Sequence, residues 1–309
     1  MQIYLPIAEI PINMFMIFGM GGTVGFLSGL FGIGGGFLLT PLLIFSGIPP
    51  AVSVATVTTQ IVASSASGVL AYWRQNAIDF KLAFCLLCAG VVGSALGVWL
   101  FGVLKSLGQL DLVISLSYVT FLGTIGALML GESVKAISRR KSGAVTSARR
   151  PGQHNWVHGL PFKVRFRRSK LYVSIIPIIG IGSSIGFLGS VLGIGGGFMM
   201  VPALIYLLRV PTSIVIGTSL LQILVTMAAA TILHAINTQT VDIVLALTLM
   251  IGGVIGAQFG AQVGQGMRGE HLRLLLALLV LGVGLRFAYN LVVEPEDKYS
   301  VVVEEVQKP

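Results

Sequence analysis

Two runs of glycine supply the most distinctive chemistry of this sequence. One is Gly32-Ile33-Gly34-Gly35-Gly36 and the other Gly193-Ile194-Gly195-Gly196-Gly197, and each stands before a phenylalanine and an apolar stretch. Because glycine disfavours a continuous helix, each run should end one helix and begin another. The first N–H groups of a helix lack internal partners and, with the helix dipole, bind anions. The glycines predicted to bind an anion are Gly32, Gly34, Gly35, Gly36, Gly193, Gly195, Gly196 and Gly197.

Polar side chains follow each glycine run in the next apolar segment. Hydroxyl and amide groups can donate hydrogen bonds to an anion without the desolvation cost of a buried lysine. Hydrogen bonding between neighbouring helices is the alternative use for the same groups. The side chains predicted to bind the anion are Thr56, Gln60, Thr218, Ser219 and Gln222.

The two glycine runs belong to a longer internal repeat. Gly25-Phe26-Leu27 matches Gly186-Phe187-Leu188 at an offset of 161, and the offset continues through the glycine runs to the prolines Pro41 and Pro202. After two one-residue insertions, Asp79 matches Asp242 and the later glycines match as well. The sequence therefore predicts two homologous four-segment repeats, each with a glycine-broken first segment.

The solvent around this chain must be lipid. Hydrophobic residues make up 55% of the 309 residues and charged residues only 10%, with a mean hydropathy of +0.92, whereas soluble domains carry about a quarter charged residues. Apolar segments long enough to cross a bilayer are expected at 52–73, 81–104, 111–131, 213–235, 244–264 and 272–292. Two more apolar stretches, 14–47 and 172–208, are too long for one span and are broken by glycines. The fold class predicted is an all-α polytopic membrane protein.

Basic residues concentrate in the one long hydrophilic stretch, residues 132–171. It holds 11 of the 20 lysines and arginines against the single acid Glu132, and the rest of the chain is nearly balanced. The positive-inside rule makes this loop cytoplasmic, and its composition suggests a linker. The expected organisation is a first transmembrane repeat over 12–131, the basic loop over 132–171, a second repeat over 172–292 and an acidic tail over 293–309. No nucleic-acid partner is expected.

The charges also favour one orientation of the repeats. If each glycine-broken stretch re-enters the membrane, each half has three spans, the halves are inverted, and Arg209, Arg268 and Arg273 lie inside with the basic loop. If each stretch crosses, there are eight spans in parallel repeats and those arginines lie outside. We therefore expect inverted repeats in a bacterial cell inner membrane.

Enzyme chemistry has no support in the sequence. Gly32-Ile33-Gly34 lacks the context of a dinucleotide site, and the spans contain no Ser/His/Asp set and no metal-ligand cluster. We expect no enzyme activity, no cofactor and no metal. Asp79 and Asp242 are expected to cap helices, and His234 to lie at the membrane interface, with titration in a coupled cycle as its alternative.

The sequence resembles the sulfite exporter TauE/SafE family, also called the TSUP family. The resemblance is carried by the stretch from Gly25 to Gly36 with Pro41, by its copy from Gly186 to Pro202, and by Gly217-Thr218-Ser219-Leu220. The first half departs from the family pattern, reading Ala55-Thr56-Val57 where Gly-Thr-Ser is usual. The resemblance implies secondary export of sulfite or an organosulfonate. A non-transporting scaffold or receptor that acts through the basic loop is the alternative function.

Overall fold

The structure is a computed structural model that describes residues 2–31, 35–74, 76–141, 163–166, 169, 171–206, 212–266 and 269–293. Ten helices and two short hairpins make up this part of the chain. The first half contains β1 (Gln2–Leu5), β2 (Ile10–Asn13), α1 (Met14–Phe31), α2 (Gly36–Phe45), α3 (Pro50–Arg74), α4 (Phe80–Ser106) and α5 (Leu110–Lys141). The second contains β3 (Lys163–Phe166), β4 (Leu171–Ser174), α6 (Ile175–Leu192), α7 (Gly197–Tyr206), α8 (Thr212–Asn237), α9 (Ile243–Gly266) and α10 (Gly269–Val292).

Seven helices of the described chain are long and apolar enough to cross a membrane: α3, α4, α5, α6, α8, α9 and α10. The six predicted spans are confirmed among them. The seventh, α6, is the first part of the glycine-broken stretch 172–208. The all-α membrane class is confirmed, with the addition of the two hairpins. Helix α5 continues to Lys141, so the first ten residues of the predicted linker are helical.

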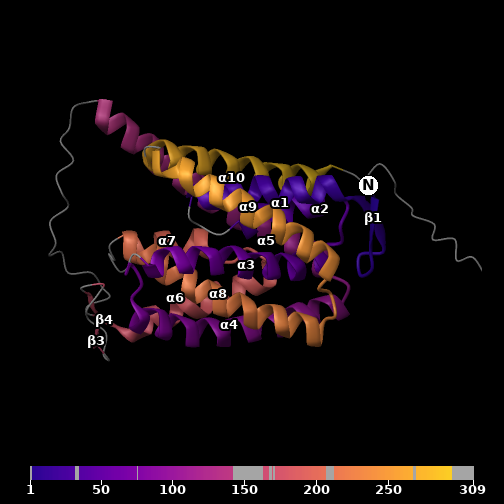
Figure 1. Cartoon of the computed structure of the whole chain (residues 1–309), viewed down its shortest axis with the longest axis horizontal. Helices are drawn as coiled ribbons and strands as arrows, with labels where there is room; N and C mark the ends of the chain where they lie inside the picture. Colours follow the sequence, from indigo (N-terminus) through magenta and orange to yellow (C-terminus); the bar gives the residue numbers. More distant parts are fainter. Residues whose placement is uncertain are drawn as a thin grey trace, which may run out of the picture.

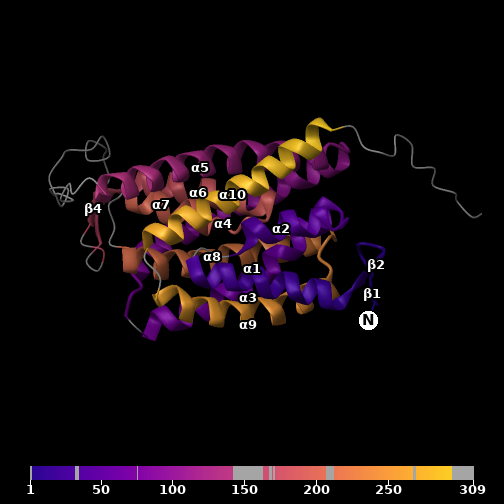
Figure 2. The ribbon, with the colours of Figure 1, turned by 90° about the horizontal axis from the view of Figure 1, so that it is seen from above.

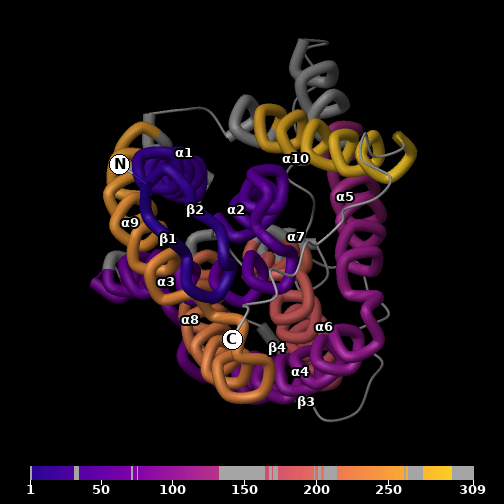
Figure 3. Tube along the Cα trace, turned by 90° about the vertical axis from the view of Figure 1, so that its right-hand side faces the viewer, coloured from indigo at the N-terminus to yellow at the C-terminus, as the bar shows by residue number. Residues whose placement is uncertain are grey.

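Helices from the two halves pack against each other in matched pairs. Helix α1 packs mainly on α9 and α6 on α4, while α3 packs on α8 and α5 on α10. Seen end-on in Figure 3, the short helices α2 and α7 lie inside the ring that the long helices form. The halves are therefore interleaved rather than side by side.

Glycines allow the closest of these approaches. A methyl group placed on Gly93 of α4 would overlap the carbonyl oxygen of Ser183 on α6, and one on Gly256 of α9 would overlap that of Gly22 on α1. Only residues without side chains let two helix backbones come this near. The glycine pattern of α4 and α9 thus sets the spacing of both helix pairs.

Helices α3 and α8 run in opposite directions. Thr56, near the start of α3, is bonded to Asp242, which lies between α8 and α9. Thr218, near the start of α8, is bonded to Asp79, which lies between α3 and α4. The start of each helix therefore lies at the end of the other. Figure 1 shows the two hairpins at opposite ends of the bundle, with β1 at one end and β3 and β4 at the other.

The first glycine-broken stretch turns back inside the bundle. Gly35, directly before α2, packs on Val24 and Ser28 of α1, while Ser46, directly after α2, lies 3.7 Å from the sulfur of Met20, further back along α1. Helix α2 therefore returns alongside α1, as the view in Figure 2 also shows. Its side chains are largely buried, including Phe37, Leu39 and Leu43.

Candidate functional site

The two glycine breaks touch each other in the interior of the bundle. A methyl group placed on Gly36 would come 2.7 Å from the carbonyl oxygen of Gly193 and 3.0 Å from the carbonyl carbon of Ile194. Ile61 of α3 packs against both Gly36 and Gly195. Two segments that are far apart in sequence are thus brought together, with α3 as a common wall.

The second break has the backbone geometry that only glycine readily adopts. Helix α6 ends at Leu192 and is capped by Gly193 with φ of 65°, and Gly195 and Gly196 have φ of 73° and 72°. A side chain at such angles would be strained. All five residues from Gly193 to Gly197 are buried. The prediction that this run ends one helix and begins another is confirmed.

Backbone N–H groups at this break are free within the described structure. Helix α7 begins with bonds from Met199 N and Met200 N to the carbonyl oxygen of Gly196. Among the described residues, the N–H groups of Ile194, Gly195 and Gly196 have no such acceptor. Successive unpaired N–H groups in a turn of this kind form a concave anion-binding feature.

The first break is described only from Gly35 onward. Gly35 precedes α2, accepts bonds from Leu38 N and Leu39 N at 3.2 Å, and contributes no side-chain cap. Gly36 is the first residue of α2 and is buried. The predicted site residues Gly32 and Gly34 lie outside the described residues.

Buried polar atoms without partners gather on α3 and α8. Gln60 is 1% exposed, and both polar atoms of its carboxamide lack a hydrogen bond within the described structure. It lies against Gly253 of α9, just as Gln222 lies against Gly90 of α4. Burying an unpaired polar group is costly, so each such atom calls for a ligand or another explanation. The side chains with such atoms are Thr59, Gln60, Ser65, Ser219 and Gln222.

Two predicted binding residues are already engaged in the bundle. Thr56 Oγ1 accepts a hydrogen bond from Asp242 N, and Thr218 Oγ1 accepts one from Asp79 N, each at 3.1 Å. Both side chains are fully buried. Their hydroxyl oxygens join the two halves, an arrangement that agrees with the alternative of helix–helix bonding.

The predicted capping role of Asp79 is confirmed. Its Oδ1 accepts from Lys81 N at 3.2 Å and from Leu82 N at 3.3 Å at the start of α4. Asp242 Oδ1 accepts from Leu245 N in the same way. Asp79 Oδ2 accepts hydrogen bonds from the backbone N–H and the hydroxyl of Ser169, in the β3–β4 hairpin. Asp242 Oδ2 accepts one from the backbone N–H of Ile7, in the β1–β2 hairpin. The hairpin contacts have no counterpart in the sequence prediction.

The expectation that His234 lies at the interface is wrong. The side chain is fully buried, with its ring 4.7 Å from that of Phe101 and Nε2 3.0 Å from the carbonyl oxygen of Ser190 on α6. It lies inside because α4 and α6 cover the end of α8 on that side. A sequence alone does not reveal such a partner.

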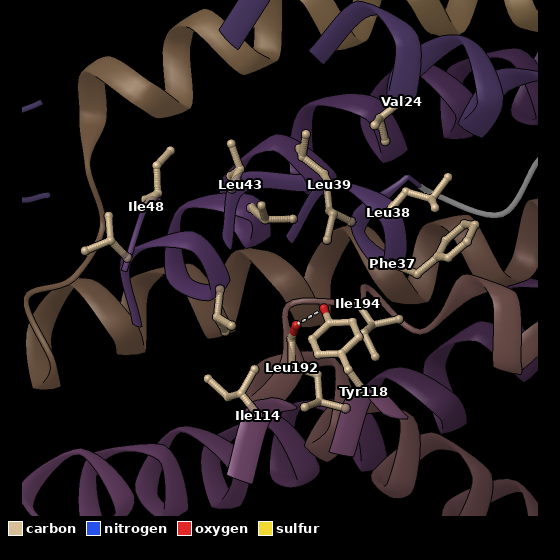
Figure 4. Packing of buried hydrophobic residues seen from close by; sticks show 14 of the residues in the cluster. Val24, Phe37, Leu38, Leu39, Leu43, Ile48, Ile114, Tyr118, Leu192 and Ile194 are labelled. Carbon is tan, nitrogen blue, oxygen red and sulfur yellow. Dashed lines mark hydrogen bonds between the residues drawn. The ribbon is translucent and has the colours of Figure 1, made fainter. Parts of the chain in front are cut away.

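Three side chains hold the end of α6, and two of them, Tyr118 and Thr40, were missed in the sequence. Tyr118 donates to the carbonyl oxygen of Leu192 at 2.6 Å, a bond drawn in Figure 4. Thr40 donates to that of Gly193 at 3.2 Å, and His234 contacts that of Ser190. Each comes from a different helix, so only the folded structure brings them together.

The interior carries little charge. Among the described residues, the buried ionisable carboxylates are Asp79 and Asp242, and no lysine or arginine is buried. No three His, Cys, Asp or Glu side chains of the described chain gather closely enough to hold a metal ion. An anion near the breaks would therefore meet dipoles and neutral hydrogen-bond donors.

Comparison with known proteins identifies the family. The family model "Sulfite exporter TauE/SafE" matches residues 17–287. The chain is 29% identical over 270 residues to "Probable membrane transporter protein YjnA" of Bacillus subtilis, which covers 86% of this chain and 96% of that protein. It is 27% identical over 281 residues to "Probable membrane transporter protein MJ0441" of Methanocaldococcus jannaschii, with 86% and 92% covered.

A shorter match is to a plant protein. The chain is 35% identical over 113 residues to "Sulfite exporter TauE/SafE family protein 5" of Arabidopsis thaliana, over 34% of this chain and 24% of that protein. No solved structure matches. The full-length relatives are named as membrane transporters rather than enzymes. By the extent of the family match, the chain belongs to the sulfite exporter TauE/SafE family.

Proposed function

We propose that this membrane transporter exports a small anion, of the sulfite or organosulfonate class, across a bacterial cell inner membrane by a secondary mechanism. The observation that carries the proposal is the contact of the two glycine breaks, where Gly36 meets Gly193. Secondary transporters bind substrates where broken helices meet, with free N–H groups facing an anionic group. The printed family name supports sulfite as the first substrate to test.

The binding groups we assign are neutral. The N–H groups of Ile194, Gly195 and Gly196 supply donors, and Gln60 supplies a buried Nε2 without a partner. Gln222 Nε2 donates one hydrogen bond to Thr226 Oγ1 and has a second N–H to offer. Hydrogen bonds to a charged group are about twice as strong as those between neutral groups. An oxyanion can satisfy several such donors at once, whereas the described residues place no buried acid beside the breaks for a cation.

We also assign the two halves to inverted repeats. Adding 161 to the bounds of β1, β2, α1 and α2 gives those of β3, β4, α6 and α7, so the duplicated unit includes the hairpins. The opposite directions of α3 and α8 support the inversion. With the predicted basic loop in the cytoplasm, both broken segments re-enter from opposite faces, and alternate opening of the two halves moves the anion.

A transport assay with a set membrane potential tests the proposal. Moving one elementary charge through 100 mV is worth about 2.3 kcal/mol, so an interior-negative potential should accelerate sulfite efflux from proteoliposomes that contain the protein. Liposomes without protein provide the control. Efflux equal to that of the control contradicts transport of sulfite, and it is the result that a non-transporting scaffold would give. Efflux that is above the control but independent of the potential contradicts uncoupled movement of a net charge.

A further inference from the structure

The carbonyl groups at the end of α6 accept hydrogen bonds from side chains of other helices. The last carbonyl groups of a helix have no partner inside it. Here Tyr118 of α5 donates to the carbonyl of Leu192 at 2.6 Å, and Thr40 of α2 donates to that of Gly193 at 3.2 Å. Both donors come from the first half of the chain, and both acceptors flank the second glycine break.

Both donors are themselves rigidly placed. Tyr118 is fully buried, and its ring stacks on Phe287 of α10 with centroids 5.0 Å apart and planes 10° apart. Thr40 is fully buried in α2. Figure 4 shows Tyr118 beside Ile194 and Leu192. The hydroxyl groups are therefore directed by packing and not by solvent.

Because the peptide bond is planar, a hydrogen bond that fixes the direction of a carbonyl group also fixes the direction of the next N–H group. In a trans peptide the C=O of one residue and the N–H of the next lie in one plane and point in opposite directions. A donor on the carbonyl of Gly193 therefore fixes the direction of the Ile194 N–H, which points away from Thr40. In the same way, Tyr118 fixes the peptide that joins Leu192 to Gly193.

The matching positions of the other half carry no such donor. Thr40 corresponds to Val201 at the offset of 161, and Tyr118 falls within the apolar stretch Leu279–Leu281 of α10. A valine or leucine side chain cannot donate to a carbonyl. The hydroxyl donors of the second break therefore have no counterpart at the matching sequence positions of the other half.

We infer that Tyr118 and Thr40 are positioning residues that set the affinity of the α6–α7 break for its anion. This inference rests on the proposed function, because it assigns a role within the same site. Neither side chain needs to touch the anion. Thr40 holds the carbonyl of Gly193, so the same peptide presents the Ile194 N–H on the side of the break that faces away from Thr40, where we place the anion. Tyr118 holds the preceding peptide, between Leu192 and Gly193, on which the orientation of the break depends.

The test compares Tyr118→Phe and Thr40→Val with wild type in sulfite efflux from proteoliposomes. Phenylalanine keeps the ring on Phe287, and valine keeps the shape of threonine. Because each variant frees one peptide to reorient, the KM for sulfite should rise about 3- to 10-fold while Vmax stays within about twofold. Thr40→Ser keeps the hydroxyl donor and should therefore have the wild-type KM.

Two controls separate positioning from general stability. Thr248→Val removes a hydroxyl whose partner among the described residues is the carbonyl of Val244 on its own helix, so its KM should equal that of wild type. Thermal unfolding in detergent is measured for every variant, and the KM values are compared at a temperature at which all of the variants are folded. An unchanged KM in both Tyr118→Phe and Thr40→Val, or a fall in Vmax alone, overturns the inference. If wild type itself does not transport sulfite, the proposed function fails first, which keeps the two failures distinct.

Discussion

The backbone N–H of Asp242 donates to the hydroxyl oxygen of Thr56 over 3.1 Å, joining the start of α9 to the start of α3. The same bond, with the same length, joins Asp79 to Thr218 at the opposite end of the bundle. Each aspartate also binds the hairpin that precedes the first helix of the other half, through Ser169 or Ile7. Matching networks thus tie the two halves together at both ends.

Loss of the Asp79 carboxylate should destabilise the protein. It accepts bonds from Lys81 N, Leu82 N and both donors of Ser169, and buried donors left without an acceptor are costly. We expect Asp79→Ala to lower the free energy of unfolding by about 3 kcal/mol. Asp111→Ala, at an exposed carboxylate in the first turn of α5, should cost under about 0.5 kcal/mol. Equal thermal unfolding of the two variants in detergent would contradict the assigned network.

Gly93 should tolerate no side chain. A methyl group there would overlap the backbone of Ser183, so Gly93→Ala must push α4 and α6 apart. We expect a loss of about 2–3 kcal/mol of stability. A methyl group on Gly102 of the same helix would meet no heavy atom within 4 Å, so Gly102→Ala should be neutral or slightly stabilising, as alanine favours helix. A Gly93→Ala protein as stable as Gly102→Ala would refute this packing.

Gln60 should matter for transport and not for folding. Its carboxamide has no partner within the described residues and is 1% exposed, so Gln60→Leu removes an unpaired polar group and retains most of the volume. Unfolding should be unchanged or shifted to higher temperature. If the carboxamide binds the anion, the KM for sulfite should rise about 10-fold or more, since a bond to a charged group is worth about 1.5–3 kcal/mol.

The control for Gln60 is an exposed glutamine of the same type. Gln109 lies in the turn between α4 and α5 and is exposed. Gln109→Leu should leave the KM unchanged. A Gln60→Leu transporter with wild-type KM and Vmax would show that the Gln60 side chain does not bind the anion.

Much of the helix arrangement could be predicted from the sequence, because its signals are local. Hydrophobic length gave the six spans, and the run from Gly193 to Gly197 gave a helix break that the positive φ angles confirm. The cap at Asp79 follows from its place before an apolar segment. Each of these features depends on neighbouring residues alone.

The features that escaped prediction depend on residues far apart in the chain. The hairpins β1–β2 and β3–β4 are built from four-residue strands without a strong alternating pattern, and the aspartates that bind them, Asp242 and Asp79, lie far from them in the chain. Tyr118 looks like an ordinary membrane-helix aromatic until its hydroxyl is seen on Leu192. The burial of His234 likewise results from Phe101 and Ser190 on other helices.

The most direct test of the central claim is sulfite efflux by Gly195→Ala, measured in proteoliposomes at an interior-negative potential beside Gly180→Ala. Gly195 has φ of 73° and faces Ile61 at the break, whereas Gly180 on α6 has open space around it. Size-exclusion chromatography confirms that equal amounts of folded protein are compared. Gly195→Ala should lose about 90% or more of the wild-type efflux, because strain at a positive φ reorients the N–H donors. Gly180→Ala should retain the wild-type efflux. Wild-type efflux by Gly195→Ala would contradict the assignment of the anion site to the glycine breaks.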